Sequence, residues 1–411
     1  MGRSQGVIDV LTISQRTPIA LKEHKPTRLP KDAIPSDVGE ALWREHGKLI
    51  SVEFPSPKTD HEWELVPQGW VGYFAVAEDF VFWLQPKVEI LNLFRMLEYA
   101  YRLKSFRFLD GEIESSSLED FYERLANVLA KRVLDRARRG LYRSYVPESN
   151  DLPYVRGQMD VQRTVQSPWD VKLHCHYQLH TPDIEENQIL AWTLLRITRS
   201  DITLERSLPA VRRAYRTLQG TVDLKQFRPH DCVDRLYHRL NEDYQPLHAL
   251  CRFFLENTGP SHNVGNRKML PFLVNMDRLF EQFVAEWLRL HLPPEWSIES
   301  QERVYIGDDQ NWYFEVDLVL YRADTSEPVC VLDTKYKAYK SSSDDIAQVV
   351  AYAGSKSCKH AVLIYPTVVE PILDEYVGEV RVRSLTFSLD GDLEDGGRKF
   401  AEELLARLVK Y

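Results

Sequence analysis

One stretch towards the end of the chain, residues 314–337 (FEVDLVLYRADTSEPVCVLDTKYK), constrains the fold most. Alternating apolar and polar residues lead into the turn-like segment ADTSEP, and the apolar run VCVL follows, a pattern typical of a β-hairpin. In an antiparallel hairpin centred near Thr325, Asp317 and Asp333 lie opposite each other. Lys335 shares a strand face with Asp333, because side chains two residues apart point the same way. The sequence therefore predicts two carboxylates and a lysine on one side of a hairpin.

Such a group of side chains indicates metal-assisted phosphodiester chemistry. Opposed carboxylates repel each other unless a cation lies between them, and their hard oxygens suit Mg²⁺, with Mn²⁺ as an alternative. We expect Asp317 and Asp333 to hold the metal, and Lys335 to position the attacking water or help to deprotonate it, and to offset charge on the phosphate. The spacing of Asp317 from the triplet Asp333-Thr334-Lys335 resembles the PD-(D/E)xK nucleases. The alternative from sequence alone is a solvated hairpin whose charges meet by chance.

Two predicted helices flank the hairpin and add three candidate residues. Residues 275–292 place apolar side chains at helical spacing, and Glu281 on this helix is either a third metal carboxylate or an ordinary exposed glutamate. Residues 345–352 predict a second helix, on which Gln348 and Tyr352 share one face. RecB-like nucleases carry such a Q-x-x-x-Y helix beside the metal site, so the resemblance implies a role for this pair. One polar and one core residue on an ordinary helix explain the pair equally well.

Several segments together resemble the McrC family, the nuclease subunits of McrBC-type modification-dependent restriction systems. The resemblance rests on VLDTKYK, then QVVAY, then VLIYP, where AVLIY predicts a buried central strand. Upstream segments match family landmarks in the same order: LNLFRMLEYAYRL, RRGL, VRGQMDVQRT and ENQIL. The resemblance to this family covers about residues 91–411. It implies a Mg²⁺-dependent DNA endonuclease subunit that acts on modified double-stranded DNA, of the methylcytosine type, and that docks on a hexameric AAA+ GTPase of the McrB type and stimulates its turnover.

Composition favours a protein that works inside the cell as part of a complex. The chain of 411 residues has no signal peptide and no long apolar run, so we expect a cytoplasmic protein without membrane contact. Its five scattered cysteines predict reduced thiols, not a disulfide framework. The net charge of −9 is unfavourable for autonomous DNA binding, whereas a recruited subunit tolerates it. No P-loop motif is present, so nucleotide hydrolysis must come from another protein.

The expected fold is a mixed α/β multidomain protein with three parts. Residues 1–90 form a β-rich module, residues 91–270 a mostly helical docking region, and residues 271–411 an α/β domain of the PD-(D/E)xK restriction-endonuclease-like fold. Aromatic residues of the first part either pack a small β core or cage a flipped, modified base. In the first part we predict strands at 7–13, 48–54, 70–76 and 80–84, and a helix at 38–45 that follows an extended loop. In the second part we predict a helix that ends at Gly140 and further helices at 189–198, 204–218 and 234–256.

Two other clusters stand out in the middle of the chain. The helix before Gly140 carries the densest basic cluster, which either contacts DNA or a partner or is a solvated face favoured by the helix dipole; its members are Lys131, Arg132, Arg136, Arg138, Arg139 and Arg143. His174, Cys175, His176 and His180 raise the question of zinc, but in a strand Cys175 points away from its neighbours and no second ligand pair follows. We therefore do not expect a structural zinc.

Two functions from other classes remain open at this stage. The chain could be a stand-alone repair or recombination nuclease of the same fold, which would cleave without a nucleotide. It could instead be a non-catalytic regulatory subunit of an AAA+ complex with a vestigial site. The intact set of Asp317, Asp333 and Lys335 argues against the vestigial site.

Overall fold

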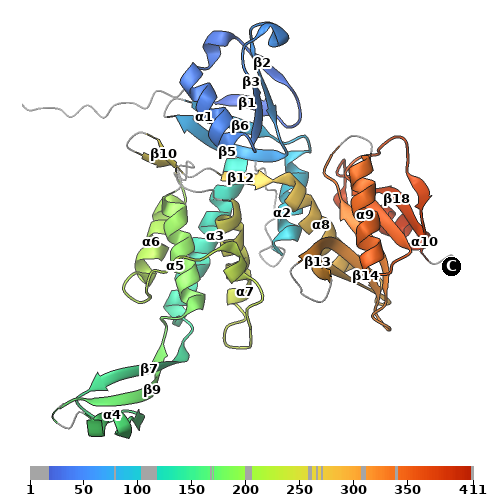
Figure 1. Ribbon diagram of the computed structural model, residues 1–411. Helices are drawn as coiled ribbons and strands as arrows, with labels where there is room; N and C mark the ends of the chain where they lie inside the picture. The colour runs from blue at the N-terminus through green and yellow to red at the C-terminus, as the bar shows by residue number, and fades with distance from the viewer. Residues whose placement is uncertain are drawn as a thin grey trace, which may run out of the picture. The chain divides into compact units, whose positions relative to one another are not determined.

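The computed structural model describes residues 18–77, 80–102, 118–166, 169, 171–199, 206–257, 262–264, 267–269, 272–306, 312–337 and 341–408. These residues form a mixed α/β structure with five sheets and helices between them (Figure 1), which confirms the expected class. The chain divides into two compact units, residues 1–87 with 261–273 and residues 88–260 with 274–411. The expected division into three domains at positions 90 and 270 stays a prediction.

The first unit is rich in β-structure, as predicted. One sheet has the order β2-β4-β3, a second the order β1-β6-β5-β12, and β10 pairs with β11. Three predicted strands are confirmed as β3, β5 and β6, and the predicted helix as α1; the strand expected at 7–13 lies outside the described residues. The segment expected to be an extended loop contains β2, which pairs with β4. The elements are β1 (Ile19–Lys22), β2 (Thr27–Leu29), α1 (Ser36–His46), β3 (Ile50–Glu53), β4 (Trp63–Pro67), β5 (Trp70–Ala77), β6 (Phe80–Gln85), β10 (His262–Val264), β11 (Arg267–Met269) and β12 (Phe272–Asn275).

Aromatic side chains form much of the hydrophobic core of this unit. Trp63, Phe74 and Phe82 are at most 2% exposed and pack with aliphatic residues of α1 and of both larger sheets. The indole Nε1 of Trp63 donates a hydrogen bond to the carbonyl oxygen of Lys31 (3.1 Å), which fixes the ring in place. Rings that are enclosed in this way cannot stack on a flipped base, so for these three residues the packing interpretation is confirmed.

The helical part of the second unit contains α2 (Ile90–Ala100), α3 (Leu118–Arg139), α5 (Glu185–Thr198), α6 (Leu208–Leu218) and α7 (Tyr244–Asn257). α3 ends as predicted at Gly140, whose φ of +97° lies in the left-handed region that glycine adopts without strain. The helix predicted for 234–256 was wrong in its first half, because α7 begins only at Tyr244. There the side chain of Asn241 bonds the backbone at His238 and Leu236 and holds a turn instead.

The mostly helical prediction for this region also missed a sheet. β7 (Ser144–Leu152) and β9 (Leu173–Thr181) pair antiparallel over their whole lengths, β8 (Gln158–Met159) adds to β9, and α4 (Val161–Gln166) lies at the far end. We call residues 144–181 the arm; Figure 1 shows it extending from the end of the helices.

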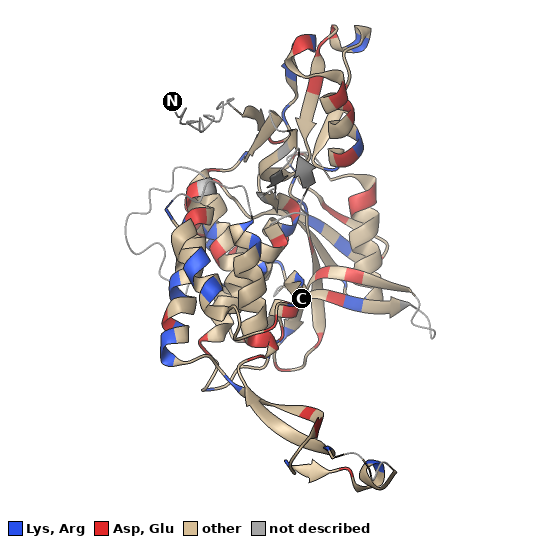
Figure 2. Ribbon diagram, turned by 90° about the vertical axis from the view of Figure 1, so that its left-hand side faces the viewer, with Lys and Arg blue, Asp and Glu red and all other residues tan. Residues whose placement is uncertain are grey.

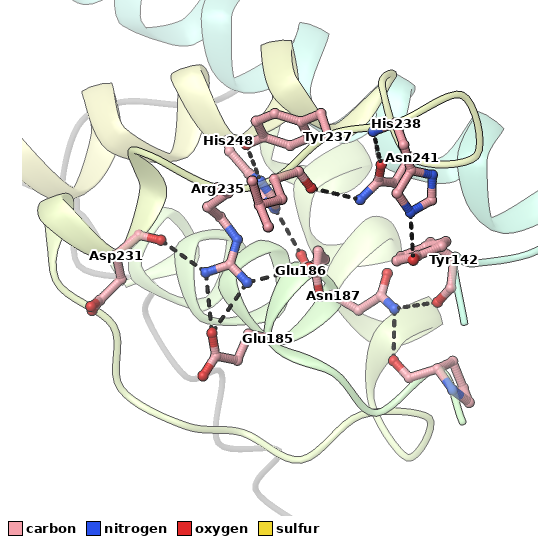
Figure 3. A network of polar contacts seen from close by, with 12 residues as sticks. Tyr142, Glu185, Glu186, Asn187, Asp231, Arg235, Tyr237, His238, Asn241 and His248 are labelled. Carbon is pink, nitrogen blue, oxygen red and sulfur yellow. Dashed lines mark hydrogen bonds and ion pairs between the residues drawn. The ribbon is translucent and has the colours of Figure 1, made fainter. Parts of the chain in front are cut away.

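Asn187 of α5 holds the base of the arm (Figure 3). Its buried side-chain amide donates to the carbonyl oxygens of Tyr142 (2.9 Å) and Pro182 (2.7 Å), the two points where the chain enters and leaves the arm. Its oxygen accepts from the Tyr244 hydroxyl (2.6 Å), which in turn accepts from the backbone N–H of Tyr142 (3.0 Å). Arg235 pairs with Glu185 and Glu186 on the same helix. The segment ENQIL therefore supplies the side chain that anchors the arm to α5 and α7.

The C-terminal part is a six-stranded mixed sheet of order β13-β14-β15-β16-β18-β17. β15, β16 and β18 run parallel, and the remaining pairs are antiparallel. The central strands β15 and β16 are almost wholly buried, as expected of apolar runs covered on both faces. The elements are α8 (Met276–His291), β13 (Trp296–Ile306), β14 (Trp312–Arg322), β15 (Pro328–Thr334), α9 (Ser343–Ser355), β16 (His360–Tyr365), β17 (Asp374–Val377), β18 (Val380–Thr386) and α10 (Leu393–Ala406). Among the described helices, none has the length and apolarity needed to cross a membrane.

Candidate functional site

The β14–β15 hairpin has the register that the sequence predicts. Leu318 pairs with Leu332 and Val319 with Val331, so the next position along the ladder sets Asp317 opposite Asp333. The backbone N–H of Thr334 donates to Oδ2 of Asp317 (3.1 Å), which ties the two strands together at this point. The prediction that the two carboxylates meet across the hairpin is confirmed.

Asp333 is the most enclosed residue of the site. It lies near the end of a central strand with no exposed surface, and neither carboxylate oxygen accepts a hydrogen bond of good geometry from the described residues. Lys335 Nζ lies 2.8 Å from Oδ2 as its charge partner, on the strand face that the sequence predicts. Burial and the charge of Asp317 raise the pKa of Asp333 to about 7, even though Lys335 lowers it. An ionised carboxylate that is buried in this way destabilises the folded protein, and a bound cation would remove this destabilisation.

Glu281 on α8 belongs to the same electrostatic group. Burial raises its pKa to about 7, and the charges of Asp317 and Asp333 add to the effect. Burial also raises the pKa of Asp317, against the hydrogen bonds from Thr334. The two aspartates therefore disfavour the ionised form of Glu281, and Asp317 disfavours that of Asp333, which links Glu281 to the site electrostatically.

A line of hydrogen bonds leads from Lys335 into α9. Lys335 Nζ donates to Oε1 of Gln348 (3.0 Å), and Gln348 Nε2 donates to the hydroxyl of Tyr352 (2.8 Å). Gln348 and Tyr352 thus share a helix face, as predicted, and the amide orients the lysine. Asp345, at the start of the same helix, lies 4.0 Å from Lys335 and pairs with Lys337. Asp345 is not among the residues predicted for the site, although Ser342 and Asp345 form a capping box that the spacing S-x-x-D could have revealed.

Gln301 of β13 is a second residue that the sequence did not reveal. The pairs Ser300–Leu318 and Glu302–Val316 flank it, which places Gln301 opposite Asp317, yet its φ of +54° interrupts the ladder. Its Nε2 donates to Oε1 of Glu281 (3.3 Å). A non-glycine residue in the left-handed region is strained, and such strain gathers at functional sites. No local pattern in the strand SIESQERVYI signals this conformation.

The donor set at this site suits a hard divalent cation. Its ligands would be carboxylate oxygens of Asp317, Asp333 and Glu281, and the orphaned oxygens of Asp333 are the strongest indication. Within the described ranges, no three His, Cys, Asp or Glu side chains are gathered into a preformed metal cluster. Mg²⁺ needs only one or two protein carboxylates because it keeps several of its waters, so the residues present fit this ion.

The basic cluster on α3 is partly neutralised within the chain. Arg136 lies against the Tyr244 ring (5.2 Å), pairs with Asp243 (3.5 Å) and donates to the carbonyl oxygen of Leu240 (3.4 Å), so it packs instead of facing solvent. Arg138 pairs with Asp135 (3.0 Å). Lys131, Arg132, Arg139 and Arg143 are exposed. A contact with DNA or a partner through this cluster stays a prediction for its exposed members, and Arg136 is no longer one of the candidates.

The histidines of β9 have partners inside the arm. His174 and His176 share one face, with ring centroids 5.1 Å apart, and Cys175 is buried on the other side. Nδ1 of His174 lies 2.6 Å from a carboxylate oxygen of Asp151, and Nδ1 of His176 lies 2.6 Å from the Ser149 hydroxyl. These contacts account for both rings without a metal.

Comparisons with known proteins bear on the family of the chain. Residues 65–366 match the family described as "McrBC 5-methylcytosine restriction system component". The Type IV methyl-directed restriction enzyme EcoKMcrBC of Escherichia coli K12 is 25% identical over 279 residues, which are 62% of this chain and 75% of that protein. The fold is similar to that of a chain in a structure of Thermococcus gammatolerans McrB AAA+ hexamers with bound McrC, with a TM-score of 0.53 and 20% sequence identity. The match covers 95% of this chain and 100% of that chain. Because the family match spans most of its length, the chain belongs to the McrBC restriction-component family.

Proposed function

We propose that the chain is the Mg²⁺-dependent DNA endonuclease subunit of a modification-dependent restriction complex. The observation that carries the proposal is the meeting of Asp317, Asp333 and Lys335 across one hairpin, with Glu281 beside them. The six-stranded sheet and its helices, residues 271–411, would then be a PD-(D/E)xK domain.

Each residue has a distinct part in this proposal. Mg²⁺ bound by Asp317, Asp333 and Glu281 would supply Lewis-acid stabilisation of the phosphate and an acidified water. Burial lowers the pKa of Lys335, but Asp333 and its neighbours outweigh burial and raise it. In the metal-free chain this favours the protonated lysine, which would orient the attacking water and offset charge on the phosphate. Gln348 and Thr334 hold Lys335 and Asp317 in position.

Cleavage by an Asp333→Ala variant tests the assignment. Methylated plasmid is incubated with the full chain, its AAA+ partner, GTP and Mg²⁺, and we expect the variant to lose cleavage by orders of magnitude. Asp324→Ala is the matched control, because Asp324 is an exposed acid in the turn of the same hairpin. Full cleavage by the Asp333 variant contradicts the site. Cleavage by the isolated chain without any nucleotide favours a stand-alone nuclease instead.

We further propose that the arm docks on an AAA+ GTPase of the McrB type, because the related structure joins McrC to McrB hexamers. The far part of the arm exposes Tyr154, Val155, Val165, Trp169 and Val171, and Trp169 and Val171 are more than 80% exposed. Apolar side chains gathered in this way mark protein-binding surfaces. Recognition of the modified base would belong to the partner, since Trp63, Phe74 and Phe82 of the first unit are enclosed and cannot stack on a base.

Replacement of the arm's apolar residues tests the docking. The full chain alone is expected to hydrolyse little GTP, and to raise phosphate release by the partner when titrated in. The double variant Trp169→Ser/Val171→Ser should lose this stimulation and its binding to the partner. Trp43→Ser is a matched control, because Trp43 is also largely exposed but lies on α1. Unchanged stimulation by the double variant would rule out the arm as the docking element.

A further inference from the structure

The structure contains a second basic surface, on α6, that the sequence analysis did not identify. Val211, Ala214 and Leu218 form the buried face of this helix, and Arg212, Arg213 and Arg216 lie on the exposed face. The three arginines, with Pro209 and Thr217, line an open hollow of about 560 Å³. Figure 2, seen from the side on which α6 lies in Figure 1, shows Lys and Arg positions on the helices of this side. We call these three residues the α6 arginine face.

Among the described residues, no acidic side chain neutralises the charge of the α6 arginine face. Positions 206–222 contain four arginines and no aspartate or glutamate. In the part of the chain that the structure describes, none of the three side chains forms an ion pair, in contrast to Arg136 and Arg138 on α3. A local positive surface that persists on a chain of net charge −9 needs a counterpart, because otherwise the three like charges only repel one another.

The character of the hollow favours a phosphate backbone over a protein. Protein-binding surfaces centre on aromatic or aliphatic anchors, and Pro209 is the only apolar member of this lining, whereas such anchors gather on the arm. Guanidinium groups form bidentate hydrogen bonds to phosphate oxygens. Arg212 and Arg216 are one turn apart, about 6 Å along the helix axis. One DNA strand advances about 3.4 Å per nucleotide along the duplex axis, so this spacing suits phosphates about two nucleotides apart.

We propose that the α6 arginine face binds the sugar–phosphate backbone of duplex DNA, apart from the cleavage site and without reading sequence. This inference rests on the proposed function, because it assumes that DNA is the substrate of the chain. It adds a non-specific track that holds the duplex while the β14–β15 hairpin cuts.

DNA binding at graded salt tests the proposal. Fluorescence anisotropy of a labelled duplex is measured with the full chain carrying Asp333→Ala, in EDTA, so that neither cleavage nor metal enters the result. The triple variant Arg212→Ala/Arg213→Ala/Arg216→Ala should bind at least tenfold more weakly at 50 mM salt. Its slope of log affinity against log salt should be shallower by about 3, since each phosphate contact contributes about 0.9.

Two further variants separate local contacts from overall charge. The control Arg44→Ala/Lys58→Ala/Arg398→Ala removes the same three charges from exposed positions elsewhere and should keep both affinity and slope. Replacing the three arginines of the face by lysine should restore most of the affinity, because the charges remain.

Four outcomes would overturn the proposal: no DNA binding at 50 mM salt, an unchanged triple variant, an equal loss in the control, or loss of binding to the AAA+ partner with DNA binding intact. The last outcome would make the face a protein-docking surface. None of these outcomes bears on whether Asp333 is needed for cleavage, so the failure of this inference and the failure of the proposed function are distinguishable.

Discussion

Replacing Asp333 by Asn should stabilise the metal-free protein at alkaline pH while it abolishes cleavage. Burial and Asp317 raise the pKa of Asp333 from 3.8 to about 7, so the folded state disfavours its ionised form. A difference of about 3 units corresponds to about 4 kcal/mol at 1.36 kcal/mol per unit. The raised pKa already contains the opposing attraction of Lys335, so this difference is the net cost of the ionised carboxylate. Lys335 keeps Gln348 as a partner in the variant, so the expected gain is about 4 kcal/mol at most.

The sign of the pH dependence follows from the direction of the shift. Between pH 4 and pH 7 the folded state binds the Asp333 proton more tightly than the unfolded state does, so stability falls as the pH rises through this range. We expect the gain from Asp333→Asn to be full at pH 8, smaller near pH 5 and absent below pH 4. Mg²⁺ should stabilise the unaltered chain at pH 8 and leave the variant unchanged.

Urea denaturation in EDTA, at pH 5 and pH 8, measures the effect. Asp374→Asn serves as the matched control, because hydrogen bonds and ion pairs with Arg381 and Arg383 outweigh burial and lower the pKa of Asp374. Its stabilising contribution is present above the unfolded pKa and lost as the pH falls, so this variant should be less stable at pH 8. If Asp333→Asn were also less stable than the unaltered chain at pH 8 without metal, the ion pair with Lys335 would outweigh burial and the reasoning would be refuted.

Three further predictions concern residues around the site and the arm. Gln348→Ala should lower kcat for cleavage about tenfold with little change in KM, because Lys335 loses its hydrogen-bond partner while contacts with DNA remain. Steady-state kinetics measure both constants, and a change in KM alone would contradict the positioning role. Gln301→Gly should raise the free energy of unfolding by about 0.5–1 kcal/mol relative to Gln301→Ala, because glycine relieves the left-handed strain; equal stabilities in urea would show that no strain is stored. Asn187→Ala should lower the free energy of unfolding by about 1–3 kcal/mol, because two carbonyl groups lose their hydrogen-bond donor. It should also weaken stimulation of the AAA+ partner while metal-dependent cleavage survives. Normal stimulation by a destabilised variant would show that the base of the arm is not needed for docking.

Local patterns in the sequence were sufficient for the hairpin and for the Gln348–Tyr352 pair. Alternation along a strand and the length of one short turn set the register, so Asp317, Asp333 and Lys335 follow from spacing alone. Gln348 and Tyr352 are one helical turn apart, and this distance does not depend on what surrounds the helix. Three strands of the first unit, β3, β5 and β6, and the end of α3 at Gly140 follow from equally local rules.

Features that depend on distant partners were decided only by the tertiary structure. Glu281 could be read as a surface glutamate until α8 was placed against the hairpin, where burial and the two aspartates raise its pKa. The sequence did not reveal the arm, because β8 and α4 lie between β7 and β9 in the chain and no tight turn joins the two paired strands. The basic residues show the same physics, since a charge is available for binding only if no neighbour in space neutralises it. Arg136 is paired with a residue more than a hundred positions away, whereas Arg216 has no ion pair within the described part of the chain, and only the folded chain distinguishes them.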